Sequence, residues 1–84
     1  MPPRVRLTPD EAARLPRLLA RVDGLRSAFP VHTGASGQAA WIREQYTDGQ
    51  PPSLNLITLL LFEHGVHRST EQVAQDLAML REES

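Results

Sequence analysis

The sequence of 84 residues contains no cysteine and no lysine, and it lacks a long apolar run. Without cysteine the chain forms neither disulfides nor thiolate zinc sites, which fits a reducing compartment. The longest apolar run is about half of the ~20 residues that a membrane-crossing helix needs, and no secretory apolar segment lies near Met1. We therefore expect a cytoplasmic protein without a membrane segment. All nine basic residues are arginine, which is typical of GC-rich bacterial genomes.

Length and charge limit the architecture further. A chain of this size is expected to form one domain over residues 1–84, with roughly 60 to 65 % of its unfolded surface buried. Residues 1–30 carry six arginines against three acidic residues, a net charge of +3, and residues 31–84 carry three arginines against seven, a net charge of −4. A nucleic-acid-binding domain is usually basic overall, so this balance argues against that class, whereas two opposite poles permit head-to-tail self-association.

Residues 54–62 are apolar at seven of nine positions. So many apolar residues do not fit one stripe of an amphipathic helix, so a helix here must be covered on most sides. A buried strand is the alternative interpretation, but leucine outnumbers the β-branched residues. In addition, Ser53 can cap a helix, and Gly65 followed by Val66 suits a Schellman end. We therefore predict a central helix over residues 54–64.

Capping and breaking signals predict the remaining elements. The segment Thr8-Pro9-Asp10-Glu11 contains a capping box and a proline at the first helical position. It predicts a helix that runs to Gly24, with a kink or break near Leu15 caused by Pro16. We further expect a helical turn over 25–29, a loop over 31–37, a helix over 38–47, and a last helix that opens with a capping box from Ser69 to Gln72.

These elements together predict an all-α fold. Five or six short helices would form a compact antiparallel bundle around residues 54–64. The expected core partners of the central helix are Phe29, Trp41, Ile42 and the leucines of the first helix.

Motifs for catalysis or cofactor binding are weak. Glu63, His64 and His67 could suggest a metal site, but the two histidines stand at i, i+3 across a helix end, whereas a helical zinc pair needs i, i+4. The segment 34–37 lacks the lysine and the glycine spacing of a phosphate loop. Four serines lie at turns or helix starts, where capping explains them: Ser27, Ser36, Ser53 and Ser69. We predict no catalytic residue, no metal and no cofactor, and hence no enzyme.

Two other functions remain as alternatives. The sequence Pro52-Ser53-Leu54 resembles the serine of an acyl carrier protein, although the usual preceding aspartate and the strongly acidic helix are missing. This pattern would suggest a docking or carrier-like domain of a multienzyme assembly. Residues 69–79 resemble the first helix of a helix-turn-helix, but too few residues follow for a recognition helix. This second pattern would suggest a DNA-binding fragment.

A stripe of arginines is the feature most suggestive of binding. Arg14, Arg17 and Arg21 follow the spacing i, i+3, i+7, which places them on one side of the first helix, opposite its leucines. One interpretation is a solvated polar face that Asp10 and Glu11 partly neutralise. The other is a basic patch that docks an acidic patch on a protein partner or a second copy. Candidates for the acidic side are Glu71, Asp76, Glu82 and Glu83 of the last helix, or Glu44 and Asp48.

The order of these signals resembles the effector-associated and death-like (CARD-like) adaptor domains of prokaryotic immune and conflict proteins. The matching parts cover most of the chain: residues 7–11 with Leu15, Leu18 and Leu19, the small-residue loop before Trp41-Ile42, Pro51-Pro52 before Leu56-Ile57 and Leu60-Leu61, then Gly65, Val73-Ala74, Leu77 and Leu80. The resemblance implies a six-helix fold with a split first helix and no active site. It also implies a recruitment function in bacterial defence, through homotypic and charge-complementary contacts.

Overall fold

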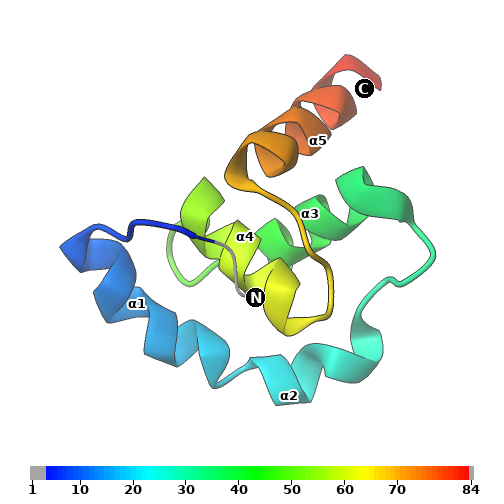
Figure 1. Cartoon of the computed structure of the whole chain (residues 1–84). Coiled ribbons are helices and arrows are strands. Elements are labelled where there is room, and N and C mark those ends of the chain that lie inside the picture. Colours follow the sequence, from blue (N-terminus) through cyan, green and yellow to red (C-terminus); the bar gives the residue numbers. More distant parts are fainter. Residues whose placement is uncertain (1–3, 84) are drawn as a thin grey trace.

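The computed structural model describes the backbone of residues 4–83 and the side chains of residues 4–80. This part of the chain consists of helices and connecting loops and contains no strand. The predicted all-α class is therefore confirmed. The elements, shown in Figure 1, are α1 (Pro9–Leu19), α2 (Val22–Leu25), the 3₁₀ helix η1 (Arg26–Ala28), α3 (Gly34–Gln45), α4 (Leu54–Glu63) and α5 (Thr70–Glu83).

Helix α4 occupies the centre of the molecule. It contacts α1, α3 and α5, and Figure 1 shows it between α1 and α5. Half of its ten residues are buried, because an almost entirely apolar helix must be covered on several faces. This finding confirms the central helix predicted over residues 54–64. The buried residues are Leu56, Ile57, Thr58, Leu60 and Leu61.

Both ends of α4 have the predicted caps. At the start, the hydroxyl of Ser53 accepts a hydrogen bond from the backbone N–H of Leu56 at 3.3 Å. At the end, Gly65 has a φ of +86°, a left-handed conformation that glycine adopts without strain. The N–H of Gly65 donates to the Phe62 carbonyl and the N–H of Val66 donates to that of Leu61, each at 2.9 Å. These two bonds form a Schellman motif.

Helix α1 begins as predicted but ends earlier. The Thr8 N–H donates to the Glu11 carboxylate at 2.8 Å, and the Glu11 N–H donates to the Thr8 hydroxyl at 3.2 Å, which completes the capping box. The predicted break near Leu15 is wrong, because the helix continues past Pro16. The missing proline N–H removes one bond of the helix, while the Pro16 carbonyl still accepts from the N–H of Ala20 at 3.1 Å.

The break in the first helical region lies instead at Ala20 and Arg21. The N–H of Arg21 bonds to the Leu18 carbonyl, three residues back, which tightens the turn. The new direction places Val22 in the core at the start of α2. Gly24, predicted to stop the helix, lies inside α2. The first region is thus divided, five residues later than predicted from Pro16.

Helix α3 begins four residues before its predicted start at Gln38. Its first turn is the segment 34–37 that was expected to be a loop. Gly34 enters the helix with a φ of +79°, which favours glycine. A Cβ at Gly37 would lie 2.9 Å from Cβ of Thr33, so a side chain there would collide with Thr33. The small residues of this segment thus allow the first turn of α3 to lie close to Thr33, and they do not prevent a helix.

Helix α5 opens with the predicted capping box. The Ser69 N–H donates to the Gln72 side chain at 3.0 Å, and the Gln72 N–H donates to the Ser69 hydroxyl at 3.2 Å. Its apolar side packs on α3 and α4 through Val73 and Leu77. The expected core partners of α4 are confirmed, with Trp41 and Leu15 partly buried at the edge, except for Leu19, which is exposed at the end of α1. The core consists of Leu18, Val22, Phe29, Ala39, Ile42, Tyr46, Leu56, Ile57, Leu60, Leu61 and Val73.

Candidate interaction surface

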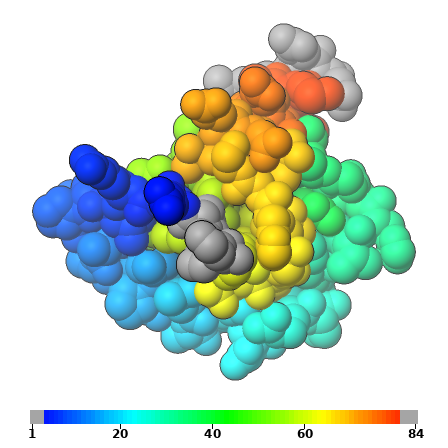
Figure 2. Space-filling view, in the orientation of Figure 1, coloured from blue at the N-terminus to red at the C-terminus, as the bar shows by residue number. Residues whose placement is uncertain are grey.

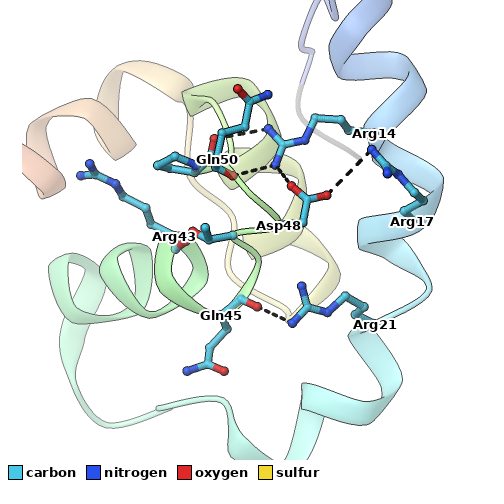
Figure 3. A network of polar contacts seen from close by, with 9 residues as sticks. Arg14, Arg17, Arg21, Arg43, Gln45, Asp48 and Gln50 are labelled. Atoms are coloured by element: carbon cyan, nitrogen blue, oxygen red, sulfur yellow. Dashed lines mark hydrogen bonds and ion pairs between the residues drawn. The ribbon is translucent and has the colours of Figure 1, made fainter.

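The arginines of α1 bind the loop between α3 and α4. Arg14 is buried, with 8 % of its surface exposed. Its guanidinium forms an ion pair with Asp48 and donates to the backbone carbonyls of Gln50 at 3.0 Å and Pro51 at 3.3 Å. Figure 3 shows the side chain reaching from α1 into this loop. Arg14 therefore fixes the loop that leads into α4 and is not available to a partner.

This position corrects the interpretation of Arg14 as part of an exposed stripe. Arg14 precedes the core residue Leu18 by four positions, so the two side chains lie one turn apart on the same face of α1. Asp48, considered from sequence as an acidic partner, does meet the arginines, but within the same chain. The carboxylate stays partly accessible, so a single arginine does not enclose it.

The other two arginines of the stripe lie nearer the surface. Arg17 keeps 70 % of its side chain exposed and approaches the second carboxylate oxygen of Asp48 at 3.9 Å. Arg21 donates to the backbone carbonyl of Gln45 at 2.6 Å, and its guanidinium lies 5.5 Å from the ring centroid of Tyr46. Both side chains contact residues between positions 45 and 48, as Figure 3 shows. Arg14 thus holds the loop before α4 against α1, whereas Arg21, predicted on the same helix, lies beyond the end of α1 at the start of α2 and binds the end of α3.

The predicted acidic docking surface on α5 also has fewer available residues than expected. Asp76 is buried, with 6 % exposed, and accepts two hydrogen bonds from Arg68, at 3.1 Å and 2.9 Å. Because this bidentate pair is internal, Asp76 is corrected from a docking residue to a structural one. Glu71 is exposed at the start of α5 and forms no ion pair with a described residue. The side chain of Glu82 lies outside the described residues.

Glu11 connects the starts of two helices. One carboxylate oxygen accepts from the Thr8 N–H and, at 3.3 Å, from the Asn55 side chain, and the other accepts from the hydroxyl of Ser53. The hydrogen bonds from Ser53 and Thr8 hold the pKa of Glu11 below its ordinary value of 4.5. The Ser53 hydroxyl is thus occupied by Glu11 and by the cap of α4, a structural use that the carrier-like alternative does not explain.

His64 lies in a cluster of aromatic rings at the end of α4. Its ring stacks on Phe29 with centroids 4.7 Å apart, Trp41 contacts it edge-on, and its Nε2 is 2.9 Å from the Tyr46 hydroxyl. Burial is the main reason that the pKa of His64 is lowered from 6.5. Its Nδ1 is buried without a hydrogen-bond partner among the described residues. His67 stacks on Phe62 instead, so the two histidines serve separate contacts.

An apolar groove lies between α3, α5 and the loop that precedes α4. It consists of two hollows of about 330 Å³ and 370 Å³ that share Arg43, Pro51 and Leu77. Leu54 borders the first hollow with 41 % of its surface exposed. In the orientation of Figure 2, α5 projects above the surface formed by the other helices. The remaining residues of the groove are Ala40, Glu44, Thr47, Pro52, Ile57, Ala74, Ala78 and Leu80.

The groove contains two charged side chains of opposite sign. Arg43 and Glu44 are both exposed, and neither forms an ion pair with a described residue. Figure 3 shows Arg43 pointing away from the Arg14–Asp48 pair and toward α5. Arg43 is therefore the basic residue that faces the groove, and the sequence analysis did not single it out.

A further hollow of about 390 Å³ lies beside the start of α5, next to Arg4, Phe62, His67 and Arg68. The guanidinium of Arg68 already pairs with Asp76, so this hollow offers fewer groups for a ligand than its arginines suggest. Within the described residues, no group of three or more His, Cys, Asp or Glu side chains could hold a metal ion. Between residues 4 and 83, each helix is also too short or too polar to cross a bilayer.

Comparisons with known proteins give no relative for this chain. It matches no protein-family model, no curated protein and no solved structure. The contacts of the described residues are therefore the basis for the function proposed below.

Proposed function

We propose that this protein is a non-catalytic interaction module that recruits another protein through the groove between α3 and α5. The observation that carries the proposal is the pair of adjoining hollows around Arg43, Pro51 and Leu77. Protein interfaces combine an apolar centre with a polar rim. The groove has this composition, since aliphatic and small side chains form its walls and Arg43 and Glu44 supply the charge.

The surface differs from the one predicted from sequence. Arg14 and Asp76 are used inside the chain, so a contact between the arginine stripe and an acidic pole loses a residue on each side. The groove instead combines exposed apolar surface with charges that have no ion pair among the described residues. An exposed apolar surface of this kind in a small domain is typical of an interaction site.

The resemblance to effector-associated and death-like domains supports the same class of function. On that basis the proposal extends to a six-helix CARD-like arrangement, in which η1 is counted with the five α-helices and is the shortest of the six. It also includes a cytoplasmic recruitment role in bacterial defence. The division of the first helical region at Ala20 and Arg21 agrees with the split first helix of such domains. This part of the proposal rests on analogy of fold.

A matched pair of variants on α5 tests the proposal. Ala78 borders the groove, whereas Met79 is exposed and belongs to neither of the two hollows. Tagged wild type, Ala78→Arg and Met79→Arg would be isolated with their bound proteins from the cells that produce them. We expect Ala78→Arg to lose a partner that wild type and Met79→Arg retain, while all three melt at similar temperatures. Equal capture by all three would contradict the proposal.

A further inference from the structure

The walls of the groove determine which kind of backbone can bind there. A peptide that binds as an added strand would need free backbone N–H and C=O groups along its path, as at a sheet edge. Two walls are helices, whose backbone groups bond within the helix, and the third contains Pro51 and Pro52, which have no N–H. The Pro51 carbonyl already accepts from Arg14. A helix, which satisfies its own backbone, suits these walls better than a strand.

The shape of the groove determines the spacing of the apolar contacts. Two hollows of similar volume adjoin along shared residues. Alanines at positions 40, 74 and 78 leave room in their walls for large side chains. A helix presents apolar side chains on one face at i, i+4 or i, i+7, and such pairs are the usual anchors of a helix in a groove. Two anchors of one helix would fill the two hollows.

The charge of the groove determines the polar residue of the ligand. Of the two charged residues, Arg43 borders both hollows and Glu44 borders only one, so a group between the two anchors would lie beside Arg43. It makes no ion pair with a described residue and points toward α5. A carboxylate on the binding helix would form an ion pair with Arg43, and a basic residue at the same place would be repelled.

From these observations we infer that the groove binds an amphipathic helix of a partner protein that has two large apolar anchors and an Asp or Glu between them. This inference rests on the proposed function and specifies its ligand. It assigns Arg43 the role of selecting acidic helices, and the apolar walls the role of binding the anchors. It needs no contribution from Arg14, Arg17 or Arg21.

A helix library displayed on a neutral scaffold tests this inference, with the whole 84-residue chain as bait. Selected helices would be measured by fluorescence polarisation against wild type, Arg43→Glu, Ala78→Arg and the control Arg6→Glu. Arg6→Glu makes the same change of charge at an exposed site outside the two hollows. We expect the selected helices to carry two anchors with an intervening acid. We also expect Arg43→Glu to weaken binding by about tenfold or more, whereas Arg6→Glu changes it by less than about threefold.

The outcomes separate this inference from the proposed function. Helices that fail to bind Ala78→Arg, but lack an acid and bind Arg43→Glu normally, would overturn the inference and leave the groove as the interaction surface. Helices that bind all variants equally would overturn both. Recovery of no helix would overturn the inference. Sedimentation of the wild type and of Ala78→Arg tests whether a second copy of this chain binds in the groove. A wild-type dimer that becomes a monomer in Ala78→Arg would overturn the inference of a partner protein, because another copy would then occupy the groove.

Discussion

The hydroxyl of Ser53 donates a hydrogen bond to the carboxylate of Glu11, and this contact links the first turn of α1 to the first turn of α4. Each residue also caps its own helix, so one polar pair, 42 positions apart in the sequence, stabilises the starts of both helices. The same carboxylate accepts from Asn55. Three donors thus converge on the Glu11 carboxylate, and its loss should affect both helices.

We predict that Glu11→Ala lowers the free energy of unfolding by about 2 to 3 kcal/mol and Ser53→Ala by about 1 to 2 kcal/mol. Because the two side chains bond to each other, the double variant should lose about 1 kcal/mol less than the sum of the single variants. Urea unfolding followed by circular dichroism measures all three. The control Glu44→Ala, at an exposed site, should change stability by less than about 0.5 kcal/mol. Fully additive effects would show that the two residues do not interact.

The arginines of α1 should differ sharply in their effect on stability. We predict that Arg14→Gln costs about 2 to 3 kcal/mol, because it leaves Asp48 and two backbone carbonyls without their donor. Arg17→Gln should cost less than about 0.5 kcal/mol, because its ion pair is long and largely exposed. Urea unfolding compares the two variants. Equal, small effects would mean that Arg14 belongs to a solvated stripe after all.

Acidification should destabilise the fold through His64. The pKa of His64 is lowered from 6.5 in the folded chain, chiefly by burial, so the unfolded chain binds the proton first as the pH falls. The free energy of unfolding should therefore decrease as the pH drops through 6.5. We expect this decrease to begin near the unfolded pKa of 6.5 and to continue as the pH falls in wild type and in His32→Gln, with a flatter profile in His64→Phe. Equal slopes in all three would exclude His64 as the cause.

The central helix should be sensitive to cavities. Leu60 is fully buried at the centre of the core, and its replacement by alanine should cost about 2 to 5 kcal/mol. The matched change Leu19→Ala removes a leucine that keeps 37 % of its surface exposed at the end of α1, and should cost less than about 1 kcal/mol. Thermal melting distinguishes them. A small effect at Leu60 would contradict the central position of α4.

The sequence predicted the elements that depend on neighbouring residues. The caps at Thr8, Ser53 and Ser69 and the Schellman end at Gly65 each involve residues within a few positions, so short motifs were sufficient. The segment 54–62 also predicted the central helix, because a helix that is apolar at seven of nine positions must be covered on several faces. The predicted limits of α1 and α3 were wrong. In both cases a local rule for proline or glycine, at Pro16, Gly24 and the segment 34–37, gave way to the packing of the whole helix.

The contacts of the candidate site depend on residues far apart in the chain. Arg14 meets Asp48 across 34 positions, and the spacing of the arginines alone could not show that partner. A comparison of Arg14 with Leu18 could have shown that the two lie on one face. The groove depends on the packing of α3 against α5, which no local pattern records, so Arg43 was indistinguishable from other exposed arginines in the sequence.

Photo-crosslinking from two positions tests most directly whether the groove, and not the arginine stripe, is the interaction surface. Benzoylphenylalanine would replace Leu54, an exposed residue at the border of the groove, in one variant and Ala13, beside Arg14 and Arg17, in another. Both variants would be irradiated in the cells that make the protein. We predict a discrete protein adduct from position 54 and none from position 13. An adduct from position 13 alone would contradict the account and return the interface to the arginines of α1.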